Sequence, residues 1–285
     1  MQFSWIFALV IGGVILSLAI FFGGKLFAVG TYQTQAELTK NLDVLLNPFA
    51  SIRQADVSLS KPISLPEKTN VSFECSAKAQ TIKVQLERGK EPFTMPIQNK
   101  YIFSEDFNTK ELWVFGKTFE MPWRVDNLIY VISKNYCFST NGMPETIKRE
   151  LSELNSSKMI LEGTRCDVKV CFQGTCNIVV DYNAKTVRAN KRTLQFFDDS
   201  TMYGAIFDPD EYGCNLDRLM KRLDLQADIL LEKANLLKTR GCIEIGGIKQ
   251  EITGMKASIA SKNYQSVKDY ADRISNLNII SCPLY

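Results

Sequence analysis

The first part of the chain contains one long apolar run. Residues 5–24 (WIFALVIGGVILSLAIFFGG) carry no charged side chain. At about 1.5 Å per residue, a helix of this length spans about 30 Å, the thickness of the hydrocarbon core of a bilayer. A soluble helix normally shows a polar stripe, and this run has none. The pattern therefore predicts a transmembrane anchor within residues 1–30.

A cleaved signal peptide is the main alternative interpretation of this run. Ala28-Val29-Gly30 has the small-x-small pattern of a cleavage site, but residues 1–4 carry no basic side chain and the run is unusually long for a signal peptide. Small residues four apart would also let two such helices pack closely: Gly13 with Ser17, and Ala19 with Gly23. We expect residues 5–24 to contact a lipid bilayer. Self-association through the same helix stays an alternative that this spacing alone does not favour, because small residues are common in membrane helices.

Helical periodicity continues after the apolar run. The apolar positions fall on one helical face, at Leu38, Leu42, Leu45 and Leu46. Asn47-Pro48 predicts the end of the helix, because the residue before a proline avoids the helical region. Residues 31–50 are therefore expected to form an amphipathic stalk.

Residues 51–213 have the pattern of a β-rich body. Apolar and polar residues alternate at 71–75 and 82–86, which indicates strands with one buried face. Runs rich in aromatic and β-branched residues predict more strands, at 100–104, 111–117, 127–133, 159–161, 185–189 and 193–197.

Two local motifs are expected within this body. Residues 144–154 predict a helix that starts at a proline, and with 127–133 and 159–161 it resembles a βαβ unit. Residues 166–182 predict a hairpin that turns at Gln173-Gly174-Thr175. The expected fold class of the body is α+β.

Helical periodicity returns in residues 214–285. An apolar stripe over 215–239 predicts one long helix that ends at Gly241. Further stripes predict two shorter helices separated by Ser261-Lys262-Asn263. The predicted units are an anchor (1–30), a stalk (31–50), an α+β body (51–213) and an antiparallel helical bundle (214–285).

The composition fits a globular body and excludes several functions. Of 285 residues, 45% are hydrophobic and 23% are charged, and the net charge is +3. A dedicated nucleic-acid binder carries a stronger basic excess, so no nucleic-acid partner is expected. The chain contains no histidine, which excludes Ser-His-Asp and Cys-His catalysis and histidine-ligated zinc. No motif predicts a catalytic residue, a cofactor or a metal ion.

The cysteines and sequons bear on which side of the membrane the body lies. Eight cysteines, an even number, suit an oxidising compartment. Asn70-Val71-Ser72 and Asn155-Ser156-Ser157 match the N-glycosylation pattern. Lys25 favours a cytoplasmic body by the positive-inside rule, but large folded domains translocate regardless of one charge. We expect a single-pass cell-membrane protein with an extracytoplasmic body.

Four cysteines are candidates for specific disulfides. A helix over 215–239 is about 38 Å long, so Cys214 at its start cannot bond Cys242 at its end. If the chain turns at 261–263, Cys282 returns to Cys242, whereas one continuous helix over 246–278 returns it to Cys214. The turn favours Cys242–Cys282.

The hairpin over 166–182 leaves a second choice open. A two-residue turn places Cys171 opposite Cys176, within bonding distance, whereas a three-residue turn keeps the apolar side chains on one face and separates the two cysteines. We favour the Cys171–Cys176 bond and leave the other cysteines unassigned: Cys75, Cys137, Cys166 and Cys214. The spacing of Cys166, Cys171 and Cys176 also fits part of a zinc site, although the usual second cluster is missing.

An acidic loop, Asp208-Pro209-Asp210-Glu211, precedes the long C-terminal helix. Its oxygen atoms could bind calcium, but the alternating ligand spacing of a dedicated calcium loop is missing. Negative charge near a helix N-terminus is the simpler interpretation, because the helix dipole favours it there.

Two passages carry a resemblance to known proteins: QFSWIFALVIGGVILSLAIFFGGKL at 2–26 and YGCNLDRLMKRLDLQA at 212–227. With the closing Cys-Pro-Leu-Tyr (282–285), the chain resembles uncharacterised archaeal single-pass membrane proteins with an extracytoplasmic α+β body and a cysteine-containing helical C-terminal end. This resemblance implies an architecture and no activity. The chain also resembles pilin-like subunits, whose apolar N-terminal helix continues into a globular head, although no glutamate lies near the start of its apolar run.

Three functions follow as hypotheses. The first is a membrane-anchored, extracytoplasmic, non-enzymatic binding or scaffolding protein, with a protein as one candidate for its unknown partner. The second is a pilin-like structural subunit that assembles through its N-terminal helix. The third is an enzyme that uses carboxylates or a thiol without histidine.

Overall fold

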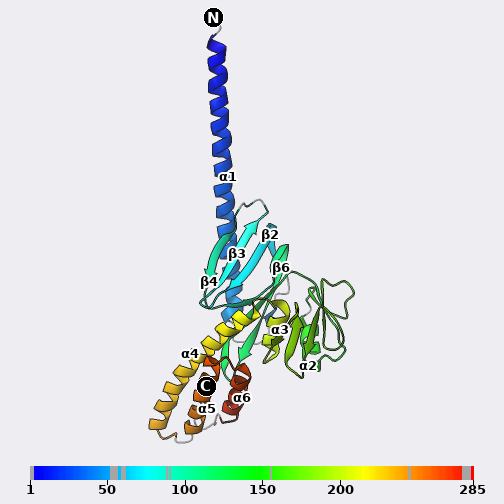
Figure 1. The fold of residues 1–285 in the computed structure, drawn as a ribbon, viewed down its shortest axis with the longest axis vertical. Helices are drawn as coiled ribbons and strands as arrows, with labels where there is room; N and C mark the ends of the chain where they lie inside the picture. Colours follow the sequence, from blue (N-terminus) through cyan, green and yellow to red (C-terminus); the bar gives the residue numbers. More distant parts are fainter. Residues whose placement is uncertain are drawn as a thin grey trace.

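The protein is a long helix that carries an α+β body at its C-terminal end (Figure 1). The computed structural model describes residues 3–51, 57–58, 62–87, 89, 91–154, 156–242, 245–277 and 284–285. Within the first helix it describes the side chains of 12–21, 30–47 and 49. The helices of the described chain are α1 (Phe3–Ser51), α2 (Glu145–Leu154), α3 (Asp199–Phe207), α4 (Tyr212–Thr239), α5 (Ile245–Ala260) and α6 (Tyr264–Leu277).

The strands form two mixed sheets, which confirms the α+β class. The first sheet has the order β4-β3-β2-β6-β7-β5, with β1 paired to β6, and the second has the order β13-β12-β11-β10-β8-β9. The first comprises β1 (Val57–Ser58), β2 (Ile63–Cys75), β3 (Gln80–Leu86), β4 (Phe93–Ile97), β5 (Tyr101–Phe103), β6 (Phe107–Glu120) and β7 (Arg124–Ile132). The second comprises β8 (Tyr136–Phe138), β9 (Met159–Leu161), β10 (Val168–Cys171), β11 (Ile178–Asp181), β12 (Thr186–Ala189) and β13 (Arg192–Gln195).

The first sheet is buried on both faces where it meets helices. Along β7, Leu128, Tyr130 and Ile132 pack into one core, and the intervening Ile129 and Val131 pack into a second. Successive strand residues point to opposite faces, so one nearly continuous apolar strand serves two cores. The second core contains the end of α1, and the first contains α3 and α4.

The C-terminal half of α1 lies along this sheet. Its buried positions recur at spacings of four and three residues, which is one helical face: Gln35, Thr39, Leu42, Leu46 and Phe49. The predicted stripe is therefore only partly right, because Leu45 is exposed. The predicted end at Asn47-Pro48 is wrong: α1 runs on to Ser51. Phe49 packs on the sheet, and its carbonyl accepts a hydrogen bond from the Asn127 side-chain amide at 2.8 Å.

The second sheet corrects two predictions. The βαβ unit exists, but α2 joins β8 to β9, which pair in parallel, and the strand over 127–133 belongs to the first sheet. The predicted hairpin over 166–182 is wrong, since β10 and β11 are parallel neighbours. The connection between β10 and β11 therefore returns to the start of β10 before β11 begins. There the Lys169 backbone N–H donates to the Asn177 side-chain oxygen at 2.9 Å.

Helix α3 is the centre of the larger core and was not predicted. All of its residues from Ser200 to Phe207 are buried, and Asp198 caps its N-terminus in a capping box with Thr201. It has glycine at position 204, where an added Cβ would lie 2.9 Å from the Phe103 ring. The helix and the sheet can therefore approach closely only because this residue has no side chain.

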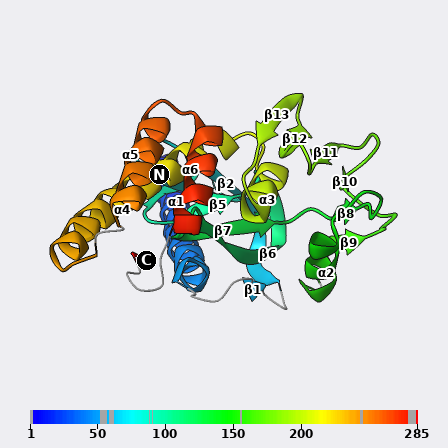
Figure 2. The same cartoon turned by 90° about the horizontal axis from the view of Figure 1, so that it is seen from below.

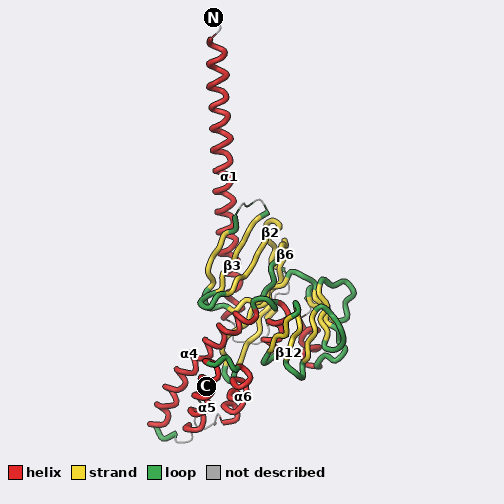
Figure 3. The backbone as a smooth tube through the Cα atoms, viewed as in Figure 1, coloured by secondary structure: helices red, strands yellow, loops and turns green. Residues whose placement is uncertain are grey.

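The three C-terminal helices agree with the prediction. Gly241 lies after α4 with a φ of +100°, and residues 261–263 separate α5 from α6. Viewed from below, α4 and α5 lie on one side of α1, α6 overlaps it, and the second sheet lies on the other side (Figure 2). Colouring by secondary structure separates the helical end from the strands (Figure 3). The boundary predicted at 213/214 falls within the first turn of α4, and one core spans the body and the helical end.

Candidate functional site

Disulfides tie the body together. The structure pairs Cys75 with Cys214, Cys137 with Cys166, and Cys171 with Cys176, with Cα–Cα distances of 5.9, 5.5 and 5.9 Å. The Cys171–Cys176 pair is the one favoured from the sequence, although it closes the loop between two parallel strands and not a hairpin. The alternative in which Cys282 returns to Cys214 is wrong, because Cys214 bonds Cys75.

The helical end holds the fourth candidate pair. Cys242 is disulfide-bonded, and no described cysteine is free. Cys282 lies outside the described residues, so the Cys242–Cys282 bond stays a prediction.

The described part of the chain offers one cluster of metal-ligand atoms, and disulfide formation consumes most of it. Ligand atoms of Cys75, Glu211 and Cys214 lie within 4.8 Å of one another. Because the two sulfurs are bonded to each other, only the Glu211 carboxylate remains as a ligand. The zinc interpretation of Cys166, Cys171 and Cys176 fails for the same reason, since these cysteines belong to two disulfides.

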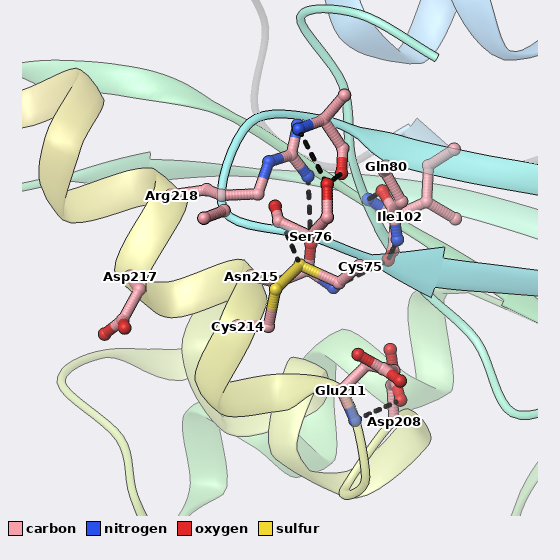
Figure 4. Close-up of a disulfide and its surroundings, with 12 residues drawn as sticks. Cys75, Ser76, Gln80, Ile102, Asp208, Glu211, Cys214, Asn215, Asp217 and Arg218 are labelled. Atoms are coloured by element: carbon pink, nitrogen blue, oxygen red, sulfur yellow. Dashed lines mark hydrogen bonds between the residues drawn. A yellow bond between two sulfur atoms is a disulfide. The ribbon is translucent and has the colours of Figure 1, made fainter. Parts of the chain in front are cut away.

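A polar clamp beside the Cys75–Cys214 bond fastens α4 to the first sheet (Figure 4). The Gln80 side chain pairs with the backbone of Ile102: its amide donates to the carbonyl at 2.5 Å, and its oxygen accepts from the N–H at 2.9 Å. Asn215 of α4 donates to the same carbonyl at 3.1 Å. These buried groups thus satisfy one another where the helix meets the strand.

Arg218 and Lys100 extend this clamp toward α1. The Arg218 guanidinium donates to the Asn215 side-chain oxygen and to the Lys100 carbonyl, each at 3.1 Å. It also lies over the Tyr101 ring, 5.0 Å from its centroid. The Lys100 ammonium forms an ion pair with Asp43 of α1. A continuous set of polar contacts therefore joins α1, the sheet and α4.

Asp208 is a buried carboxyl at the junction of α3 and α4. Its Oδ1 accepts a hydrogen bond from the Glu211 backbone N–H at 3.0 Å, and its Oδ2 has no hydrogen-bond partner among the described residues. The pKa of Asp208 is raised to about 7. Burial is the largest cause; the backbone N–H groups of Glu211 and Ser104 lower the pKa, and the nearby charges of Glu211 and Asp210 raise it. The contact with Glu211 supports the helix-terminus interpretation of the acidic loop over the calcium one.

The distal part of α4 presents an apolar surface that the described chain leaves open. Leu225, Ile229 and Leu236 lie on one helical face and are 60–65% exposed. Beside them is a groove of about 530 Å³, whose lining includes Trp123, Leu230 and Tyr285. The Trp123 indole N–H donates to the Gln226 side-chain oxygen at 2.9 Å, which leaves its ring edge-on to Tyr285. We call Leu225, Ile229, Leu236 and this groove the α4 distal face.

The projecting half of α1 is the second exposed apolar surface. Residues 12–21 are all exposed, including Ile15, Leu16 and Ile20 at 61–68%. Ser17 is the one side chain with a polar group in this segment. Across the side chains described, no helix is both long enough and apolar enough to cross a membrane.

Comparisons with known proteins do not classify the chain. The scan against family models, the search of curated proteins and the search of solved structures each give no match. The functional argument therefore depends on the two exposed apolar surfaces and on the disulfides.

Proposed function

We propose that this chain is a single-pass membrane protein whose extracytoplasmic body binds a protein partner through the α4 distal face. The observation that carries the proposal is the projecting half of α1, in which residues 12–21 expose apolar side chains on every side of the helix. Water is a poor solvent for such a surface, since burying one large apolar side chain gains about 1.5–3 kcal/mol.

A lipid bilayer is the environment that suits this helix. The uncharged stretch over 5–24 is about 30 Å long as a helix, which matches the hydrocarbon core. In α1 the backbone groups bond within the helix, as they must in lipid. Figure 1 also supports this arrangement, because the apolar half projects from the body and the strands begin only farther along the helix.

The disulfides favour the extracytoplasmic side. Three pairs lie in the described residues, and a seventh cysteine, Cys242, is also bonded. Disulfides persist in oxidising compartments and are rare in the reducing cytosol.

The α4 distal face suits a partner with an apolar segment, for example an amphipathic helix. Its exposed side chains follow helical spacing, and its groove offers aromatic rings with an indole fixed by a hydrogen bond. The C-terminal half of α4 lies at the end of the body farthest from the N-terminus of α1 (Figure 1), so an anchored chain would present this half of the helix away from the membrane.

A photo-crosslinking residue at position 229, on the membrane-bound full-length chain in its host, tests the partner proposal. We expect a discrete adduct with another protein, and loss of the adduct when Leu236 is replaced by Asp. A crosslinker at Lys238, an exposed polar position of the same helix, is the matched control. Equal adducts from positions 229 and 238, or none from 229, would contradict the proposal.

The continuity of α1 favours a second candidate function. One helix of 49 residues exposes apolar residues over 12–21 and packs on the first sheet in its second half, which resembles the layout of pilin-like subunits. In that case, the exposed half would contact other copies of the chain inside a filament. Filaments on host cells that disappear with a Leu16→Asp variant would support it, and detergent-solubilised monomers with an intact N-terminal helix would oppose it.

A further inference from the structure

One sequon lies on an open, polar part of the first sheet. Asn70 and Ser72 are two residues apart on β2 and therefore point to the same face. Val71 between them is buried in the core that contains α1. The Asn70 and Ser72 side chains consequently face away from α1, and the Asn70 side chain is exposed.

This face of the sheet is covered in one part and open in another. Over β6 and β7 it packs against α3, as the ring contact between Phe115 and Tyr203 shows. Over β2 and β3 there is a hollow of about 380 Å³. Its polar lining includes Asn70, Ser72, Lys83, Gln85 and Asn108. Asn70 lies directly across from Gln85 on one neighbouring strand and from Asn108 on the other.

We propose that Asn70 is an N-glycosylation site and that the first sugars of the glycan lie in this hollow. The proposal rests on the extracytoplasmic location in the proposed function, since N-linked sugars are added to secreted or exported sequence. The ligand class fits the hollow, because side-chain amides and an ammonium can donate to sugar hydroxyls, and amide oxygens can accept from them. A bulky hydrophilic group would also cover an otherwise open sheet face.

The reaction requires a lipid-phosphate-linked sugar as donor and a host transferase. The Asn70 side-chain nitrogen forms a bond to C1 of the reducing-end sugar. The bond between C1 and the phosphate oxygen breaks, and the lipid phosphate leaves with its electron pair. The amide nitrogen loses one proton, and no oxidant or reductant is consumed. Ser72 supplies the hydroxyl that the sequon requires two residues after the asparagine.

The test uses the full-length chain from its own host, digested with trypsin after reduction and alkylation. The peptide 69–78 contains Asn70, and 150–158 contains Asn155, which lies outside the described residues. We expect 69–78 to carry at least one sugar by mass. Asn70→Gln and Ser72→Ala should abolish the added mass, whereas Ser72→Thr should keep it. Asn108→Gln is the matched control, an exposed amide in the same hollow without a sequon, and should also keep it.

A second measurement separates failure of this proposal from failure of the proposed function. A membrane-impermeant amine reagent applied to intact cells should label Lys238, which is exposed and independent of any glycan. If Lys238 is labelled but the 69–78 peptide carries no sugar, or only the 150–158 peptide does, the Asn70 site is overturned and the extracytoplasmic location is kept. No labelling of Lys238 would overturn the outside location and the glycan together.

Discussion

The two halves of α1 use the same apolar residue types for different purposes. In the packed half, buried residues fall on one face with heptad-like spacing, and Asp43 adds an ion pair to Lys100 of the sheet. In the projecting half, residues 12–21 are exposed on all sides. A single stripe is enough to bury a helix against a sheet, whereas an all-round apolar surface needs an apolar surrounding. The packed half thus belongs to the folded core, and the projecting half is the part for which we propose a membrane role.

Charges in the projecting half should have the largest effect. Leu16→Lys combined with Ile20→Lys should prevent stable membrane association, since each lysine near the centre of a membrane helix costs about 2.5–3.5 kcal/mol. The measurement is the fraction of chain in the membrane pellet. Val44→Lys, at a residue of the packed half with similar exposure (61%), is the control and should leave that fraction unchanged. Equal loss from Val44→Lys would break the distinction between the halves.

Removal of the disulfide beside the clamp should destabilise the body and leave membrane association unchanged. Cys75 and Cys214 are 139 residues apart, so the chain-entropy relation gives about 5 kcal/mol for this bond, against about 2 kcal/mol for Cys171–Cys176, whose cysteines are 5 apart. Thermal or denaturant unfolding of the two double Cys→Ser variants measures both values. A larger loss of stability on removal of Cys171–Cys176 than on removal of Cys75–Cys214 would contradict the larger contribution expected from the bond beside α4.

Asp208 should make the stability of the body depend on pH. Its pKa is raised from 3.8 to about 7 in the folded chain, so its contribution to stability is complete below about pH 4 and is lost as the pH rises through about 7. Asp208→Asn keeps the acceptor for the Glu211 N–H and removes the charge. Between pH 4 and pH 8, the free energy of unfolding of Asp208→Asn should rise relative to that of the wild type by up to about 4 kcal/mol. Parallel pH profiles of unfolding free energy for the two proteins would show that Asp208 titrates normally.

Truncation in the packed half should destabilise the body through the loss of one buried side chain. Leu42 is 3% exposed, so Leu42→Ala should cost about 2–5 kcal/mol through lost burial and a cavity. Leu45→Ala, at an exposed neighbour, should stay within about 0.5 kcal/mol. Membrane association should be unchanged in both. Similar losses of stability from both variants would mean that the stripe on α1 is assigned to the wrong face.

The sequence predicts the elements whose burial is one-sided. The stripe over 215–239 gives α4, and Gly241 gives its end. Helix α3 escaped prediction because it is buried all round, so it has no polar side to reveal a period. The end predicted at Pro48 failed because tertiary packing of Phe49 on the sheet outweighs the local preference before a proline.

The candidate site was only partly accessible from the sequence. Cys171 and Cys176 are close in the chain, so a local argument could pair them. Cys75 and Cys214 meet only because α4 begins beside the end of β2, and no spacing rule predicts such a contact. The same holds for the clamp from Gln80 to Arg218, which depends on sheet order.

Fractionation of host cells tests the membrane assignment most directly. Membranes that contain the wild-type chain are washed with alkaline carbonate, which strips peripheral proteins, and are then extracted with a mild detergent. The full-length chain should stay in the pellet through the carbonate wash and appear in the supernatant only with detergent. Recovery of the full-length chain in the soluble fraction, with no lipid or detergent present, would contradict the role assigned to the projecting half of α1.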